Sequence, residues 1–199
     1  NDPWLGLVPE VVHTEGELAG MTTYRLYLYT PNETDFLVSC SGDDDNPLVL
    51  ESTAEPSWFQ HEAATTAFAT DVNPIFFAAF PEFAFDSWLT IGLDLAPVDA
   101  SQEGISSIGI TAEQSAFETG ANFVLNSEVG GSWFVLPGSS NGLPDEDLRV
   151  LLAQVTTGGL LSGTLNIQCF IAGNPFDEQL MAFSFGAGAP GCIDAEACN

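Results

Sequence analysis

The sequence predicts an all-β fold, namely an antiparallel β-sandwich of the jelly-roll or Ig-like kind, with at most one short helix. Most apolar segments of the 199-residue chain are short and rich in Val, Ile, Thr, Phe and Tyr. Clusters of Gly, Pro, Asn and Asp separate these segments, and helical periodicity is scarce. Short strands punctuated by turn residues are typical of sandwiches and barrels. With 45% hydrophobic residues, the chain is able to bury one large core.

The clearest strand covers residues 21–30, where side chains alternate between two faces. Tyr24, Leu26 and Leu28 point one way, whereas Arg25 and Tyr27 point the other way. This pattern predicts a strand with one buried and one exposed face. Further strands are expected at residues 35–41, 47–52, 75–80, 87–95, 122–126 and 132–136, and a single short helix is expected at residues 111–118.

Two longer strands are predicted at residues 148–157 and 161–172. Gly158 and Gly159 separate them, and because glycine tolerates a positive φ, this turn predicts a tight hairpin of antiparallel strands. A helix is the alternative for the start of the first strand, since Pro144 and the acids that follow it suit a helix N-terminus. We expect the strand.

The chain divides into two parts. We expect residues 1–186 to form the β-sandwich, and residues 187–199 to form a Gly/Ala linker and the start of a small disulfide repeat. No run reaches the roughly 18 apolar residues of a membrane span, and the first residues lack the zones of a signal peptide. We therefore expect a mature chain with no membrane insertion.

The charge balance is strongly acidic. The chain has 28 Asp and Glu residues against only Arg25 and Arg149, for a formal net charge of -26 at pH 7. Most carboxylates must face water, salt or metal ions, because unpaired carboxylates are costly to bury. Nucleic acids and anionic membranes are excluded as partners, since both require clustered Lys and Arg. A solvated acidic surface and divalent-cation binding are the two interpretations.

Two acidic clusters are candidate calcium sites. Calcium prefers several oxygen ligands from loops, and clustered carboxylates repel one another without a cation. Neither cluster matches a calcium-loop signature, so a solvated loop is the alternative for each. The candidate ligands, with Ca2+ as the expected ion and no other cofactor, are Asp43, Asp44, Asp45, Asp145 and Asp147.

Four cysteines form an even set that fits no zinc pattern. Cys192 and Cys198 enclose a short loop, which predicts a local disulfide. Cys40 and Cys169 lie in strand-like sequence and are then candidates to bridge two strands of the core, although four cysteines permit three connectivities. Disulfides indicate an oxidising compartment.

A glycosylation sequon agrees with export. It reads Asn32-Glu33-Thr34 and follows Pro31, where a turn is expected. Asn32 is therefore the candidate glycosylation site. Sequons of this kind are surface features of secreted proteins.

The end of the chain resembles a known repeat. It reads Gly191-Cys192-Ile193-Asp194-Ala195-Glu196-Ala197-Cys198-Asn199 and is similar to the opening of the Gly-Cys-x-Asp-x-x-Ala-Cys-Asn repeats in very large secreted and cell-surface proteins of marine Bacteroidetes, which are often exported by the type IX system. Residues 86–92, 147–157 and 162–168 also resemble an uncharacterised β domain that often precedes those repeats. The resemblance implies an extracellular, modular architecture and offers no catalytic residues.

Enzyme motifs are incomplete. Residues 138–142, Gly-Ser-Ser-Asn-Gly, match the nucleophile elbow of serine hydrolases, but that elbow needs a following helix in an alternating α/β chain. His61 and Glu62 begin like a zinc-protease helix, but Thr65 occupies the place of the second histidine. The lack of lysine removes Schiff-base and phosphate-loop chemistry. A paired-carboxylate glycosidase stays open, because only geometry identifies a catalytic pair.

Aromatic residues indicate a second possible role, which is carbohydrate binding. Trp88 and Trp133 lie in strand-like runs and are expected in the core. Trp58 and Phe59 follow a Glu-Pro-Ser turn, where exposed rings could stack on a sugar. These two residues are the candidate sugar-binding residues.

We therefore expect a non-catalytic structural module of a larger secreted or cell-surface protein, acting in a fibre, filament, sheath or adhesin assembly. The expected partners are copies of itself or neighbouring domains of the same parent protein. Cations are able to bridge acidic surfaces, and an edge strand or the apolar residues 4–8 can add to a neighbour's sheet. The alternative is a carbohydrate-binding module of a secreted polysaccharide-associated protein.

Overall fold

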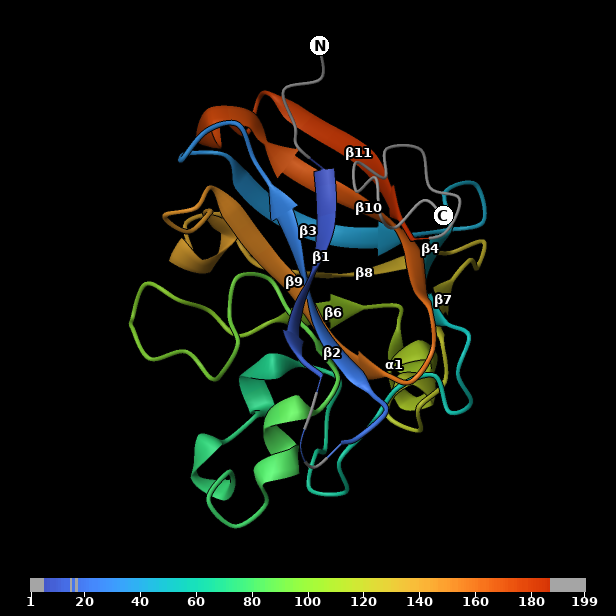
Figure 1. The fold of residues 1–199 in the computed structure, drawn as a ribbon. Helices are drawn as coiled ribbons and strands as arrows, with labels where there is room; N and C mark the ends of the chain where they lie inside the picture. Colours follow the sequence, from blue (N-terminus) through green and yellow to red (C-terminus); the bar gives the residue numbers. More distant parts are fainter. Residues whose placement is uncertain (1–5, 15, 17, 187–199) are drawn as a thin grey trace, which may run out of the picture.

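The chain folds into two antiparallel β-sheets that form a sandwich (Figure 1). The computed structural model describes residues 6–14, 16 and 18–186. The four-stranded sheet has the order β1 (Gly6–His13), β2 (Thr22–Tyr29), β9 (Arg149–Thr157) and β5 (Trp88–Leu89). The seven-stranded sheet has the order β6 (Ser106–Ile108), β8 (Gly131–Phe134), β3 (Phe36–Gly42), β10 (Leu161–Phe170), β4 (Leu48–Ser52) and β7 (Phe123–Leu125), and β11 (Glu178–Phe185) pairs with β10. The all-β sandwich expected from the sequence is confirmed.

Helical structure is short. The helix α1 (Thr111–Phe117) confirms the single helix predicted at residues 111–118. The 3-10 helices of the described chain are η1 (Ala69–Asp71), η2 (Pro74–Phe76), η3 (Pro81–Phe85), η4 (Ser140–Gly142) and η5 (Ile171–Gly173). The first three follow one another and form a lobe outside the sandwich, drawn in green at the bottom of Figure 1. We call it the 69–85 lobe.

Most predicted strands are confirmed. Those at residues 21–30, 35–41, 47–52, 122–126, 132–136, 148–157 and 161–172 correspond to β2, β3, β4, β7, β8, β9 and β10. The strand predicted at residues 87–95 is reduced to β5, because the backbone turns at Gly92, whose φ is +70°. The strand predicted at residues 75–80 is wrong, since Pro74 begins η2 and Pro81 begins η3.

β2 is largely buried on both faces. Leu26 and Leu28 face the core between the sheets. On the opposite face, Tyr27 is 9% exposed and packs with Phe83 and Trp88 in a second apolar cluster. The 69–85 lobe supplies part of this cluster, so the exposed face predicted for this strand is instead covered.

Gly158 and Gly159 do not close a hairpin. β9 pairs with β2 and β5, whereas β10 pairs with β3, β4 and β11. The turn therefore carries the chain from one sheet to the other. At Gly159, an added Cβ would lie 2.5 Å from Oγ of Ser52, so the close approach of this loop requires glycine.

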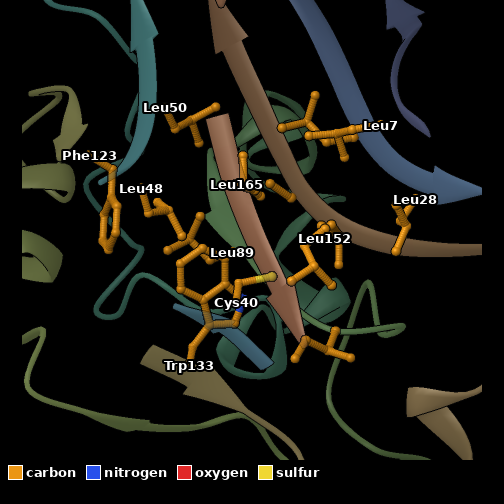
Figure 2. Packing of buried hydrophobic residues seen from close by; sticks show 14 of the residues in the cluster. Leu7, Leu28, Cys40, Leu48, Leu50, Leu89, Phe123, Trp133, Leu152 and Leu165 are labelled. Carbon is orange, nitrogen blue, oxygen red and sulfur yellow. The ribbon is translucent and has the colours of Figure 1, made fainter. Parts of the chain in front are cut away.

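The main core lies between the two sheets (Figure 2). Trp133 on β8 packs edge-on against Phe123, with ring centroids 5.7 Å apart. Its indole N–H donates to the carbonyl oxygen of Thr90 at 3.1 Å, so the polar end of the buried ring is satisfied. Ten residues of this core are labelled in Figure 2: Leu7, Leu28, Cys40, Leu48, Leu50, Leu89, Phe123, Trp133, Leu152 and Leu165.

The predicted bridge between Cys40 and Cys169 is not formed. Both are buried free thiols on the adjacent strands β3 and β10. In the register of these strands Cys40 faces Ile167 and Cys169 faces Leu37, so the two cysteines are not directly opposite each other. Burial raises the pKa of Cys40 well above its ordinary value. Burial, with a smaller effect of the charge of Asp35, raises the pKa of Cys169 to about 12.

The apolar residues 4–8 belong to a strand of this chain's own sheet from residue 6 onward. Gly6, Leu7 and Val8 begin β1, which pairs with β2 of the same chain. Leu7 is 7% exposed and belongs to the main core. Since β1 is at the edge of the four-stranded sheet, the addition of this edge to a neighbour's sheet stays a prediction.

The predicted boundary near residue 186 falls at the end of the described chain. β11 ends at Phe185. The predicted linker and disulfide repeat at residues 187–199, with Cys192 and Cys198, lie outside the described residues.

Candidate functional site

An uncharged aromatic segment is exposed on the 69–85 lobe. Residues 74–81 read Pro-Ile-Phe-Phe-Ala-Ala-Phe-Pro, and we call them the apolar segment. The exposed fractions are 72% for Ile75, 45% for Phe76 and 42% for Phe80. Adjacent exposed apolar side chains of this size mark contact surfaces in soluble proteins. The segment stands out on a chain whose formal net charge is -26.

Contacts on the inner side of the lobe hold the apolar segment in place. Phe83 is 2% exposed and packs with Trp88 in the second cluster. Phe77 lies edge-on to Phe83, with ring centroids 5.9 Å apart. The Asn73 side chain accepts a hydrogen bond from the backbone N–H of Ile75 at 3.1 Å and so caps η2. Phe76 and Phe80 are themselves partly anchored, with ring centroids 6.4 Å from Phe83 and 5.7 Å from His61, and they present their remaining surface to solvent.

β11 provides a second exposed apolar feature at an edge of the seven-stranded sheet. Among the strands that the structure describes, it pairs with β10 alone, from Glu178 to Phe185. Leu180 on the strand is 60% exposed, and Phe176 just before it is 96% exposed. An edge strand with exposed apolar side chains is a template for pairing with another chain.

Both arginines of the chain line one open surface depression. Arg25 on β2 and Arg149 on β9 meet there with Tyr27, Ser140 and Asn141. The depression therefore combines guanidinium, hydroxyl and amide groups with one aromatic ring. Such groups are suited to polar or anionic ligands, provided that their charges are not already matched.

The charge of Arg149 is already matched. Its guanidinium lies 2.7 Å from Glu10, 3.1 Å from Asp145 and 3.2 Å from Asp147, and its Cζ lies 4.2 Å from the centroid of the Tyr27 ring. The hydrogen bond to Glu10, followed by that to Asp145, raises the pKa of Arg149 above its ordinary value. An anionic ligand would have to displace the chain's own carboxylates.

Arg25 is engaged in the same way. It lies 3.4 Å from Asp94, donates from Nε to the Gln154 amide oxygen at 3.2 Å and stands 5.8 Å from the centroid of the Trp88 ring. The depression is therefore polar but close to neutral, and its two arginines act first as ties between strands and loops.

Asp145 and Asp147, predicted as calcium ligands, lie beside the guanidinium of Arg149. Asp145 Oδ1 also accepts from the backbone N–H of Asp147 at 2.9 Å, and its Oδ2 receives the Arg149 Nε–H. The structure thus places both carboxylates on a guanidinium. Both acids lie within four residues of Arg149 in the sequence, and this spacing alone could have predicted the ion pairs.

The other predicted calcium ligands lie in the turn between β3 and β4. Asp43 Oδ1 accepts from the backbone N–H of Asn46 at 2.6 Å, so this carboxylate closes the turn. Asp44 and Asp45 are exposed. Across the described residues, no group of three or more His, Cys, Asp or Glu side chains is arranged to hold a metal ion.

Asn32, the predicted glycosylation site, is exposed in the turn between β2 and β3. Its side-chain amide donates to both carboxylate oxygens of Asp35 at 3.2 Å. Asn32 is therefore exposed but its amide is engaged, and an attached glycan would replace one of these amide hydrogens. Its glycosylation stays a prediction.

The predicted sugar-binding pair is not an exposed platform. Trp58 is 1% exposed, with its ring centroid 6.1 Å from that of Phe117, so its assignment as an exposed sugar-binding residue is wrong. Phe59 is half-buried, and its backbone N–H donates to Thr156 at 2.8 Å. The loop after β4 is held against the core, because the Trp58 ring packs near Phe117 of α1 and the Phe59 backbone bonds to β9.

The two incomplete enzyme motifs have structural roles. Ser140, the serine in the nucleophile position of the elbow pattern, shares a hydrogen bond of 2.8 Å with the hydroxyl of Ser101, and the neighbouring Ser139 Oγ donates to the carbonyl oxygen of Leu136 at 2.9 Å. Buried His61 accepts at Nδ1 from the backbone N–H of Ala63 at 3.1 Å, and its Nε2 lies 3.6 Å from Glu82. These contacts hold the loop and the lobe together.

Comparisons with protein-family models, curated proteins and solved structures found no match to this chain. Within the described part of the chain, no helix is both long and apolar enough to cross a membrane. The apolar segment, the β11 edge and the distribution of charge are thus the features from which a function is inferred.

Sequence reasoning missed the apolar segment as a surface. Its aromatic composition favoured a strand, whereas the signals against a strand were the prolines at both ends and the absence of alternation. β11 was also missed, although the alternation of Met181, Phe183 and Phe185 was the signal for a strand.

Proposed function

We propose that this protein is a non-catalytic structural module of a larger extracellular or cell-surface protein, acting in a fibre, sheath or adhesin assembly. Its partners are copies of itself or neighbouring domains of the same parent. The exposed apolar segment is the observation that supports this most strongly. The resemblance of residues 191–199 to repeats of secreted proteins agrees with the location.

The energetics favour a weak contact that is repeated many times. Full burial of each exposed Ile or Phe side chain contributes about 1.5–3 kcal/mol. Ile75, Phe76 and Phe80 are only 72%, 45% and 42% exposed, so their further burial contributes about 2.5–5 kcal/mol in total. The cost of association is about 4–15 kcal/mol, so one contact offsets little more than the lower end of that cost. One such contact is transient, and linked copies on a long parent chain become stable by avidity.

Charge controls when copies approach one another. With a formal net charge of -26, two copies repel at low ionic strength. The screening length falls from about 10 Å at 0.1 M to about 3 Å at 1 M salt. Calcium at the acidic loop of Asp43, Asp44 and Asp45 would bridge such surfaces further. We therefore expect association in saline, calcium-containing surroundings.

Sedimentation velocity over a range of protein concentrations in high salt, with and without calcium, tests this proposal. The wild type should associate, and the variant Phe76→Ser/Phe80→Ser should stay monomeric. Val129→Ser is the matched control, because Val129 is 94% exposed in a distant turn before β8. A wild type that stays monomeric under all conditions, or a double variant that associates as the wild type does, contradicts the proposal.

Carbohydrate binding is the rival function. Because Trp58 is buried, the remaining candidate surface for sugar binding is the polar depression around Arg25, Arg149 and Tyr27. A glycan array distinguishes the two functions. Selective binding that disappears in Tyr27→Ala, with assembly absent, would favour the rival.

A further inference from the structure

Three buried side-chain oxygens lack a hydrogen-bond partner. They are Gln60 Oε1, Asp86 Oδ2 and Glu118 Oε1. In the described residues, the other buried side-chain atoms in this condition are two nitrogens, His13 Nε2 and Trp58 Nε1. Buried polar atoms in proteins are nearly always paired. Three orphan oxygens therefore require an explanation.

Hydrogen bonds place these three residues in the same region of the molecule. Asp86 Oδ1 accepts from the backbone N–H of His61 at 2.7 Å, so the Asp86 carboxylate lies at the backbone that directly follows Gln60. The Gln60 side chain in turn donates to the carbonyl oxygen of Phe117 at 3.0 Å, which puts its amide beside Glu118. The three oxygens thus come from the loop before the lobe, the end of η3 and the end of α1.

The two carboxylates have no cation of their own. Asp86 is 1% exposed and Glu118 is half-buried, and the charges of the two carboxylates interact with each other. Both arginines of the chain are engaged in the surface depression. Leaving such a carboxylate unpaired is costly, so a bound cation would stabilise this arrangement.

We propose that Gln60, Asp86 and Glu118 form a calcium-binding site. Calcium takes 6–8 oxygen ligands from carboxylates, amide or backbone carbonyls and water, in a flexible geometry. The two carboxylates and the amide oxygen are the ligands that the protein would supply, and water molecules would complete the coordination. With only two carboxylates the site belongs among weak extracellular modules, with a Kd on the order of 10⁻⁴ M.

A cation in this site would fasten the lobe to the sandwich. Asp86 directly follows η3. Asp71, at the end of η1, interacts electrostatically with the carboxylate of Glu118. The apolar segment lies between these two positions in the chain. Calcium would thereby fix the orientation of the apolar segment, although binding itself needs only one copy of the protein.

Thermal unfolding and titration calorimetry on the monomer test the site. Millimolar calcium, compared with chelator and with matched sodium chloride, should raise the Tm of the wild type by about 5 °C. Asp86→Asn and Glu118→Gln should lose this shift and the binding heat. Glu113→Gln on the adjoining helix α1 is the control that should keep both.

Terbium luminescence gives a readout that does not depend on stability. Trp58 lies against Phe117, next to Glu118, and should sensitise terbium bound in this site. Calcium should displace the emission in the wild type, and Glu118→Gln, which changes a half-buried side chain and should fold, should abolish it. The proposal is overturned if calcium leaves the wild-type Tm and heat unchanged, or if the shift survives in both ligand variants. Because the monomer is measured, failure here leaves the assembly proposal standing.

Discussion

Replacing Arg149 with glutamine should destabilise the fold far more than most surface substitutions. Arg149 is the hub of a cluster in which Glu10 on β1, and Asp145 and Asp147 before β9, share one guanidinium. The ring of Tyr27 lies against the same group. Removing the charge leaves three carboxylates facing one another in a chain with almost no other base.

The magnitude follows from the exposure of each partner. The two short hydrogen bonds to Glu10, at 2.7 and 2.8 Å between side chains that are 32% and 21% exposed, contribute about 2 kcal/mol. The half-exposed Asp145 adds about 0.5 kcal/mol, and Asp147, 72% exposed, adds nothing measurable. The contact with Tyr27 adds about 1 kcal/mol. The whole cluster should therefore be worth about 3 kcal/mol.

Urea unfolding of wild type and Arg149→Gln at low and high salt measures this quantity. The free energy of unfolding should fall by about 3 kcal/mol at low salt and by less at 1 M salt, where screening weakens both the ion pairs and the residual repulsion. Arg25→Gln is the matched control and should cost about 1 kcal/mol, because its pair with Asp94 spans 3.4 Å and is half-exposed. A loss below about 1 kcal/mol for Arg149→Gln, equal to that of the control, would refute the reasoning.

Three further predictions follow from the same structure. Gly92→Ala should unfold the protein or cost several kcal/mol (about 3 or more), because φ at Gly92 is +70° and a Cβ would collide with the backbone carbonyl of Asn141; the soluble yield and the Tm report it. In a chain whose two terminal cysteines are replaced by serine, Cys40 and Cys169 should not react with Ellman's reagent at pH 8 in the native state. Both should react when the protein is unfolded without reductant. If neither thiol reacts after unfolding, the two cysteines form a disulfide. Sodium chloride up to about 1 M should raise the wild-type Tm, since it screens a formal net charge of -26; a Tm that falls steadily with salt would contradict this.

Local pattern was sufficient for most of the strands. β2, β3, β9 and β10 each carry several apolar, β-branched or aromatic residues between turn residues, so their existence follows from the sequence. Their pairing does not. The turn at Gly158 and Gly159 looks like a hairpin, but whether two strands join in one sheet or in two depends on contacts with distant segments.

Long-range packing also explains the errors in the candidate sites. Trp58 follows a turn and would be exposed if only its neighbours mattered, yet the Phe117 ring lies 6.1 Å away across more than fifty positions of sequence. The orphan oxygens of Gln60, Asp86 and Glu118 are equally scattered along the chain. No spacing rule finds such a cluster, because the fold alone brings its members together.

The acidic surface, in contrast, was predictable from the composition. The acidic excess predicted exposed carboxylates, and Asp44 and Asp45 are indeed exposed. What composition could not show was an uncharged aromatic surface within this acidic chain. The apolar segment emerges because Pro74 and Pro81 stop its residues from joining a sheet, while Phe83 beneath it fixes the lobe.

Negative-stain electron microscopy of the wild type and of Phe76→Ser/Phe80→Ser, both in high salt with calcium, tests the assembly claim most directly. Fibres or regular oligomers of the wild type, and separate particles of the double variant, are the predicted result. Separate particles in both samples, or the same polymer in both, would show that the apolar segment of this protein does not build an assembly.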